Sequence, residues 1–164
     1  MIKTFYEKTI DEDLLTSISE AISSNDDIKI YLNSTGGSEW CSSAIIDIIN
    51  SNKDKVELIG FGYLLSAAFH IMMESECKKR ILDNTYGMYH QSVWDLEISA
   101  LNKPSNVLDK FRVENSIKEY RIYYEKKCKE WGFNEQELKK YKKGEDVYFS
   151  YERFKELINH KSQS

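Results

Sequence analysis

The stretch that decides the fold reads Ile28-Lys-Ile-Tyr-Leu-Asn-Ser-Thr-Gly-Gly37. From Ile28 to Leu32 apolar residues alternate with Lys and Tyr, which is the two-residue period of a β-strand. Gly36 and Gly37 follow, and glycine permits a sharp backbone turn. Residues 38–50 then place several apolar side chains on one helical face. The stretch therefore predicts a strand, a tight turn and a helix.

The same order of elements repeats along the chain. An amphipathic helix is predicted over 11–24, ahead of the first strand. Residues 56–61 predict a second strand and 66–75 a second, more apolar helix, and short strands follow at 81–82 and 86–89. This alternation predicts an α/β fold with a mostly parallel sheet covered by helices.

A different pattern occupies the last third of the chain. Apolar residues at steps of three and four predict one long helix over 107–131. The stretch 93–105 before it holds the only proline and is predicted to be an irregular excursion. Residues 151–160 predict a closing helix with Ser150 as its N-cap. With neither a repeat nor a linker in view, residues 1–164 are predicted to form a single domain.

The composition excludes several classes of protein. Hydrophobic residues make up 41% of the 164 and charged residues 30%, which is typical of a globular protein. The net charge is −4, so we expect no general attraction to nucleic acid or anionic lipid. The densest basic run, residues 139–143, has acidic neighbours and is interpreted as a solvated surface. No apolar run approaches the roughly 20 residues of a membrane span.

The N-terminus and the cysteines point to the cytoplasm. Residues 1–8 show no apolar core of a signal peptide, so export is not expected. The cysteines Cys41, Cys77 and Cys128 are odd in number and lack the spacing of metal ligands. We therefore expect reduced thiols in a cytoplasmic protein and no metal site formed by the cysteines.

Four short segments together hold the residue types that an acyl-transfer site needs. Ser66 stands where a strand and turn give way to a helix, and helix N-termini stabilise developing negative charge. Gly36 and Gly37 end the neighbouring strand, so their amides are expected to face Ser66 across the same sheet edge. The alternatives are a serine that only caps its helix and an ordinary strand-to-helix turn.

A histidine and an aspartate complete the set. His90 ends a strand and is the candidate base, although a lone histidine is more often a hydrogen-bonded core or surface residue. His70, one helical turn after Ser66, is the second candidate. Asp146 is the candidate orienting carboxylate, and composition alone does not distinguish it from other acids. A nucleophile, a base, an orienting acid and an oxyanion site are what a Ser-His-Asp mechanism needs.

These segments resemble motifs of the ClpP family, the proteolytic subunits of Clp serine proteases. The family's Asn-Ser-Pro-Gly-Gly is similar to Asn33–Gly37, and its Gly-x-Ala-Ala-Ser-Met-Gly turn is similar to Gly62–Ala68. Its Met-Ile-His-Gln resembles Met88–Gln91, and its Arg-Asp-x-Phe-Met-Ser resembles Glu145–Ser150. The family's Lys-Arg-Phe strand and Pro-Asn turn are similar to Lys79-Arg80-Ile81 and Asp83-Asn84.

The resemblance implies a fold and a set of roles. The fold would be of the ClpP/crotonase type, with stacked ββα units, and 107–131 would be its long projecting handle helix. Ser66 would be the nucleophile, His90 the base and Asp146 its orienting partner. The amides of Gly36, Gly37 and Ala67 would form the oxyanion hole. The implied function is a serine endopeptidase that hydrolyses peptides or unfolded proteins without a cofactor.

The resemblance also implies partners, and the departures from the family's pattern limit them. A homo-oligomer, of ring form in the family, is expected, because the long helix would otherwise expose Tyr120, Tyr124 and Trp131. The family docks to an ATP-driven AAA+ unfoldase. This chain begins at the family's second element, so we expect the N-terminal helix and gating loops, and with them part of that docking site, to be missing. Ser92–Ser105 contains no glycine, unlike the family's strand-like substrate-binding segment.

Two other functions remain open at this point. One is a catalytically silent relative that joins or modulates a proteolytic ring as an interaction protein. The other is a crotonase-like acyl-thioester enzyme, which builds an oxyanion hole from turn amides but has little need of a Ser-His-Asp set. The reduced ends of the chain suggest a stripped-down relative, such as one encoded by a phage.

Overall fold

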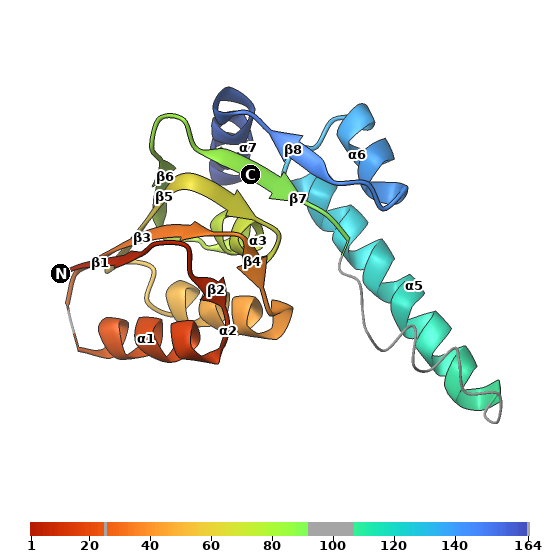
Figure 1. The fold of residues 1–164 in the computed structure, drawn as a ribbon, viewed down its shortest axis with the longest axis horizontal. Coiled ribbons are helices and arrows are strands. Elements are labelled where there is room, and N and C mark those ends of the chain that lie inside the picture. The colour runs from red at the N-terminus through yellow and green to blue at the C-terminus, as the bar shows by residue number, and fades with distance from the viewer. Residues whose placement is uncertain (25, 92–106, 164) are drawn as a thin grey trace. The chain divides into compact units, whose positions relative to one another are not determined.

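The computed structural model describes residues 1–24, 26–91 and 107–163 (Figure 1). Two compact units make up the chain. The first comprises Met1–Tyr89 and Val147–Ser164, and the second comprises His90–Asp146. Each unit is described by itself.

The first unit is built on a mostly parallel sheet. Its strands run in the order β1 (Ile2–Phe5), β3 (Ile28–Ser34), β5 (Val56–Leu65), β7 (Tyr86–Tyr89) and β8 (Val147–Phe149), and β6 (Lys78–Ile81) also pairs with β5. All pairings are parallel except that of β7 with β8. The strands β2 (Thr9–Ile10) and β4 (Gly36–Gly37) form a second, two-stranded parallel sheet. The predicted α/β fold with a mostly parallel sheet is confirmed.

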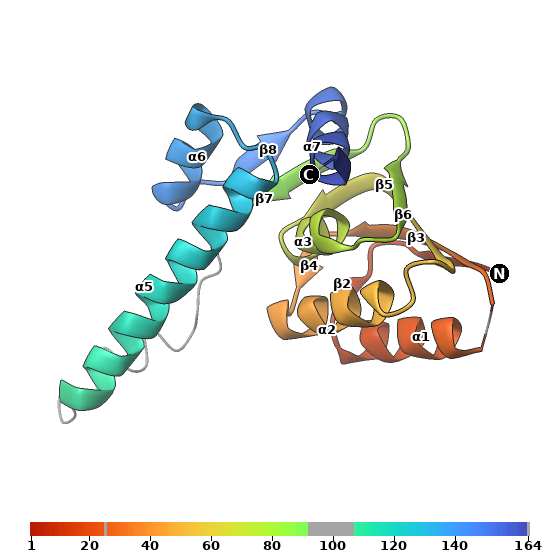
Figure 2. The same ribbon diagram turned by 180° about the vertical axis from the view of Figure 1, so that it is seen from behind.

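The helices of this unit begin where the sequence predicts. They are α1 (Glu12–Ser23), α2 (Glu39–Asn50), α3 (Ala67–Glu74) and α7 (Tyr151–Gln163). The side chains of Asp11 and Ser38 accept N-cap hydrogen bonds for α1 and α2. Ser150 accepts one from Arg153 N at 3.4 Å, so its predicted capping role is confirmed. Both views show α1 and α2 side by side along one face of the sheet (Figures 1 and 2).

An aromatic cluster fixes α3 against the sheet. The ring of Phe69 stacks on Phe149 at 5.2 Å and on Phe154 at 4.9 Å between ring centroids. All three side chains are fully or almost fully buried. Gly87 packs against this cluster and leaves no room for a side chain, since a β carbon there would lie 3.1 Å from the Phe69 ring. Burying one such ring contributes about 1.5–3 kcal/mol to the free energy of unfolding, so these contacts hold α3 firmly against β8 and α7.

Strand β5 is longer than the predicted 56–61. Its register with β3 shifts from Leu32↔Gly60 to Ser34↔Leu64, so three residues of β5 face the single residue Asn33. The buried Asn33 fills this bulge, and its Nδ2 donates to Phe61 O at 2.9 Å. Gly62, with φ +66, supplies the left-handed backbone that the bulge needs. The bulge carries the strand on to Leu65 and so sets the position of residue 66.

The second unit contains α5 (Val107–Glu130) and α6 (Glu135–Lys142). Helix α5 confirms the predicted long helix, whereas α6 was not predicted. The exposed apolar stripe predicted for α5 is wrong in part, because Tyr124 and Trp131 are buried, with 6% and 0% of their surface exposed. Tyr123 and Ile122 are exposed instead. The expected irregular stretch 93–105 lies outside the described residues.

Helix α6 takes up the basic run at 139–143. Only part of this run is a solvated surface, because Tyr141 at its centre is buried. None of the helices within the described ranges has the length and apolar character needed to cross a bilayer.

Candidate active site

Ser66 occupies a strained turn between β5 and α3. Its backbone has φ 54 and ψ −118, a region that residues with a β carbon rarely adopt. Its side chain makes no cap hydrogen bond to α3, so the simple capping role is not the one observed. The Ser66 amide donates to Met88 O on β7 at 2.8 Å. In α/β-hydrolases a strained strand-to-helix turn exposes the nucleophilic serine.

The glycine turn packs directly on Ser66. A β carbon built on Gly36 would lie 2.8 Å from both Leu65 O and Ser66 Cβ, and 3.2 Å from Ala67 N. Gly36 has φ +105 and Gly37 has φ +148, so neither position suits a side chain. The expectation that this turn faces Ser66 agrees with these distances.

The amides of the turn differ in their partners. The Gly36 N–H donates to the buried Ser34 Oγ at 3.0 Å. The Ser38 N–H donates to Ile10 O on β2 at 2.7 Å. Because alternate residues of a strand direct their N–H groups to opposite sides, the intervening Gly37 N–H points away from β2. This pattern favours Gly37 over Gly36 as an oxyanion donor.

His90 and Asp146 lie together in the second unit. The Nδ1 atom of His90 is 3.3 Å from Asp146 Oδ1, and both side chains are partly exposed, by 35% and 44%. Histidine oriented by a carboxylate at Nδ1 presents Nε2 for proton transfer. The structure therefore brings the candidate base together with its predicted partner, 56 residues further along the chain.

The second candidate base, His70, is buried in the first unit. Its Nδ1 lies 3.3 Å from Ser42 Oγ on α2, and 7% of its surface is exposed. This contact joins α3 to α2 and occupies one nitrogen of the ring. The sequence did not single out Ser42, because a serine inside a helix carries no distinctive spacing.

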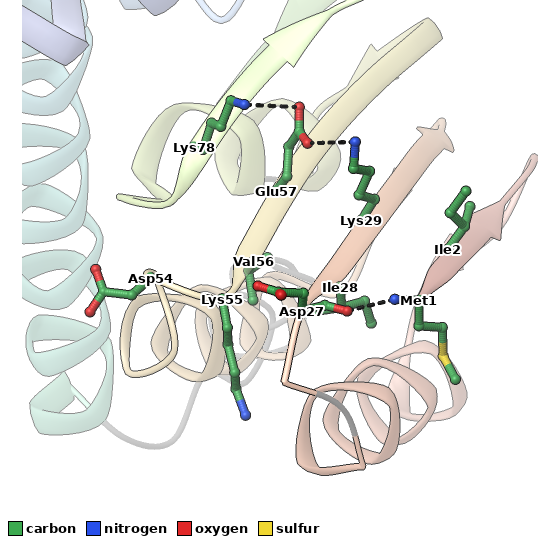
Figure 3. A pocket seen from close by; sticks show the side chains of 10 residues that line it. All are labelled: Met1, Ile2, Asp27, Ile28, Lys29, Asp54, Lys55, Val56, Glu57 and Lys78. Carbon is green, nitrogen blue, oxygen red and sulfur yellow. Dashed lines mark hydrogen bonds and ion pairs between the residues drawn. The ribbon is translucent and has the colours of Figure 1, made fainter.

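A cavity of about 460 Å³ opens at the opposite end of the strands (Figure 3). It lies where β1, β3, β5 and β6 begin, whereas Ser66 follows the end of β5. Its central carboxylate, Glu57, accepts ion pairs from Lys29 at 3.3 Å and Lys78 at 3.9 Å. These lysines offset the charge of Glu57, and we assign the cavity no role. Across the described ranges, His, Cys, Asp and Glu side chains nowhere gather in a group of three that would hold a metal ion.

Comparisons with known proteins agree on one family. Residues 2–129 match the sequence profile of the Clp protease family. The ATP-dependent Clp protease proteolytic subunit 3 of Rhizobium johnstonii is 37% identical over 75 residues, and that of Rhizobium meliloti is 36% identical over the same length. These matches cover 45% of this chain and 38–39% of the relatives, less than half of each.

A solved structure extends the agreement to the fold of nearly the whole chain. A variant of ClpP1 from Listeria monocytogenes superposes with a TM-score of 0.68 and 24% identity. The superposition covers 95% of this chain and 86% of the other. The profile match spans most of the sequence, and the chain belongs to the Clp protease family.

Proposed function

We propose that this chain is a serine peptidase in which Ser66 is the nucleophile, His90 the base and Asp146 its orienting carboxylate. The observation that carries the proposal is the strained backbone of Ser66, which lacks a capping bond and packs against Gly36. A turn that costs on the order of 1–3 kcal/mol persists where it serves a function.

Chain connectivity supports bringing the two halves of the site together. His90 follows Tyr89, the last residue of β7, and Met88 of the same strand accepts the Ser66 amide. Asp146 precedes Val147, the first residue of β8, which pairs with Tyr89. His90 is therefore tethered to β7, the strand that pairs with the nucleophile strand β5, and Asp146 is tethered to β8, the next strand of the sheet.

The proposed reaction has two stages. His90 Nε2 takes the proton from Ser66 Oγ as Oγ bonds to the scissile carbonyl carbon. The oxyanion is received by the Ala67 N–H at the start of α3 and by Gly37 N–H, where the helix dipole adds positive potential. His90 then gives its proton to the leaving amine as the C–N bond breaks. Water, activated in the same way, releases the acyl group and restores Ser66.

Family membership supports further proposals about substrate, location and assembly. The curated relatives are named as proteolytic subunits of ATP-dependent Clp proteases. We propose that this chain likewise acts on unfolded polypeptide as a cytoplasmic homo-oligomer. Light scattering that returns the mass of a single 19.3 kDa chain at working concentration would contradict the oligomer.

Labelling with a fluorophosphonate tests the catalytic proposal. We expect the probe to modify the wild type at Ser66 and to leave Ser66→Ala unmodified. The matched control is Ser51→Ala at the exposed C-cap of α2, which should label like the wild type. If the wild type stays unlabelled while its circular dichroism and melting show an intact fold, the peptidase proposal fails. A catalytically silent interaction protein is then the better description.

A further inference from the structure

A buried polar pair joins the two helices that carry the proposed nucleophile and oxyanion turn. Ser42 Oγ lies 3.3 Å from His70 Nδ1, and the two side chains are 0% and 7% exposed. Ser42 is five residues after Gly37 on α2, and His70 is four residues after Ser66 on α3. Each partner therefore sits about one helical turn from the backbone of the site.

The hydrogen bonds around the pair assign its proton. The Ser42 hydroxyl donates to Glu39 O at 2.8 Å, which is shorter than its contact with the imidazole. A hydroxyl has one proton to donate, so Ser42 Oγ accepts from His70 and Nδ1 carries the hydrogen. This arrangement gives a directional bond from α3 to α2 with a defined tautomer.

The Ser42–His70 bond links two helix ends that are themselves held by backbone hydrogen bonds. The backbone amide of His70 donates to Ser66 O at 3.0 Å in the first turn of α3. The backbone amide of Ser42 donates to Ser38 O at 3.0 Å in the first turn of α2. The first turns of the two helices are therefore rigid, and the Ser42–His70 bond fixes one turn against the other. Two apolar side chains would fill this interior space equally well, but they would not specify a single offset between the helices.

We propose that the Ser42–His70 hydrogen bond is a positioning device that sets the distance between the Gly37 amide and Ser66. The inference rests on the proposed function, because it assigns the pair a role in the same oxyanion site. Catalysis is sensitive to such offsets, since a displacement of about 1 Å can cost on the order of 10²-fold in rate. Neither side chain contacts the reacting atoms in this proposal.

A double-mutant cycle on the rate of fluorophosphonate labelling tests the device. We expect Ser42→Ala and His70→Leu each to slow labelling of Ser66 by at least about tenfold. The double variant should be no slower than the slower single variant, because both remove one interaction. His70→Asn keeps an N–H donor close to the position of Nδ1 and should recover part of the rate. Labelling at the wild-type rate in both single variants, with lowered melting temperatures, would show a purely structural pair and overturn the proposal.

A second readout does not depend on activity. In ¹⁵N–¹H spectra of the full chain, Ser42→Ala should shift the amide signals of Gly37 and Ala67, while that of Lys3 on β1 stays in place. The imidazole ¹⁵N signals of wild-type His70 should report a protonated Nδ1. Unshifted Gly37 and Ala67 signals would overturn the positioning role. If the wild type resists labelling but Ser42→Ala still shifts the Gly37 and Ala67 signals, the peptidase proposal is refuted and the positioning of the turn stands.

Discussion

The Nδ1 atom of His90 lies 3.3 Å from Oδ1 of Asp146, and this contact closes a loop of more than fifty residues. Tyr89 and Val147, the chain neighbours of His90 and Asp146, pair across β7 and β8, which brings the two side chains together. An imidazole held in this way has a defined tautomer. This contact is the orienting half of the proposed Ser-His-Asp site.

Replacing Asp146 with Asn tests the value of that contact. The Asn amide can donate to Nδ1, which leaves the proton on Nε2 and prevents His90 from acting as a base. We expect peptide hydrolysis to fall by on the order of 10⁴-fold. The adjacent carboxylate Glu145, which pairs with Lys143 at 3.7 Å, provides the control variant Glu145→Gln. Equal activity in Asp146→Asn and the wild type would remove Asp146 from the mechanism.

Gly36→Ala should damage both the fold and the site. Its β carbon would meet backbone and Cβ atoms at 2.8 Å, and its φ of +105 is unfavourable for alanine. We expect a loss of several kcal/mol in the free energy of unfolding, measured by urea titration. Gly144→Ala shares the positive φ but meets nothing within 4 Å, so it should cost only about 1 kcal/mol. Similar losses in the two variants would mean that the turn around Gly36 is looser than described.

The cysteines should resist thiol reagents until the chain unfolds. Cys41, Cys77 and Cys128 are all buried. Burial raises the pKa of Cys77 to about 11 and raises that of Cys128 further, so few thiolates form near neutral pH. Ellman's reagent at about pH 8 should therefore titrate almost no thiol in the native protein and three in guanidinium. Rapid reaction of one native thiol would show local opening around that residue.

Lys79 should make stability rise with pH. Its Nζ donates to Met73 O and Ser75 O at the end of α3, and burial lowers its pKa from 10.5 to about 8. Between these values the unfolded chain binds a proton at Lys79 that the folded chain has released. The free energy of unfolding contributed by Lys79 is therefore flat below about pH 8 and increases up to about pH 10.5, by at most about 3 kcal/mol.

Guanidinium titrations at about pH 7 and about pH 10 test this slope. The unfolding free energy of the wild type minus that of Lys79→Met should become more positive as the pH rises. Lys78→Met is the matched control, because the Lys78 side chain is 77% exposed, and its difference from the wild type should stay nearly constant. A wild type that loses stability relative to Lys79→Met on raising the pH would reverse the sign and contradict the burial effect.

The sequence was sufficient where a residue pattern determines local structure. The alternation at 28–32, the apolar periodicity of 11–24 and 38–50, and the cap at Ser150 predicted β3, α1, α2 and α7, because period and capping are local signals. Helix α6 was predictable too. Its capping box joins Asn134 and Glu137, but the neighbouring lysines favoured a solvated surface instead.

Other features depend on contacts between distant segments. Strand β8 has three residues, and it exists because Val147 and Phe149 pair with β7, about sixty residues earlier. The bulge that extends β5 depends on the Asn33 side chain from another strand. The choice between Gly36 and Gly37 as donor required the hydrogen bond to Ser34. No sequence period reports such pairings, so these parts could not be predicted.

The left-handed backbone of Ser66 has a consequence for selection in the laboratory. Glycine adopts φ 54 and ψ −118 without a side-chain penalty. Ser66→Gly should therefore raise the free energy of unfolding by about 1 kcal/mol and raise the melting temperature with it. A screen that selects only for heat resistance would therefore favour Ser66→Gly over the natural serine. The natural chain keeps it, and thermal endurance gives no reason to do so.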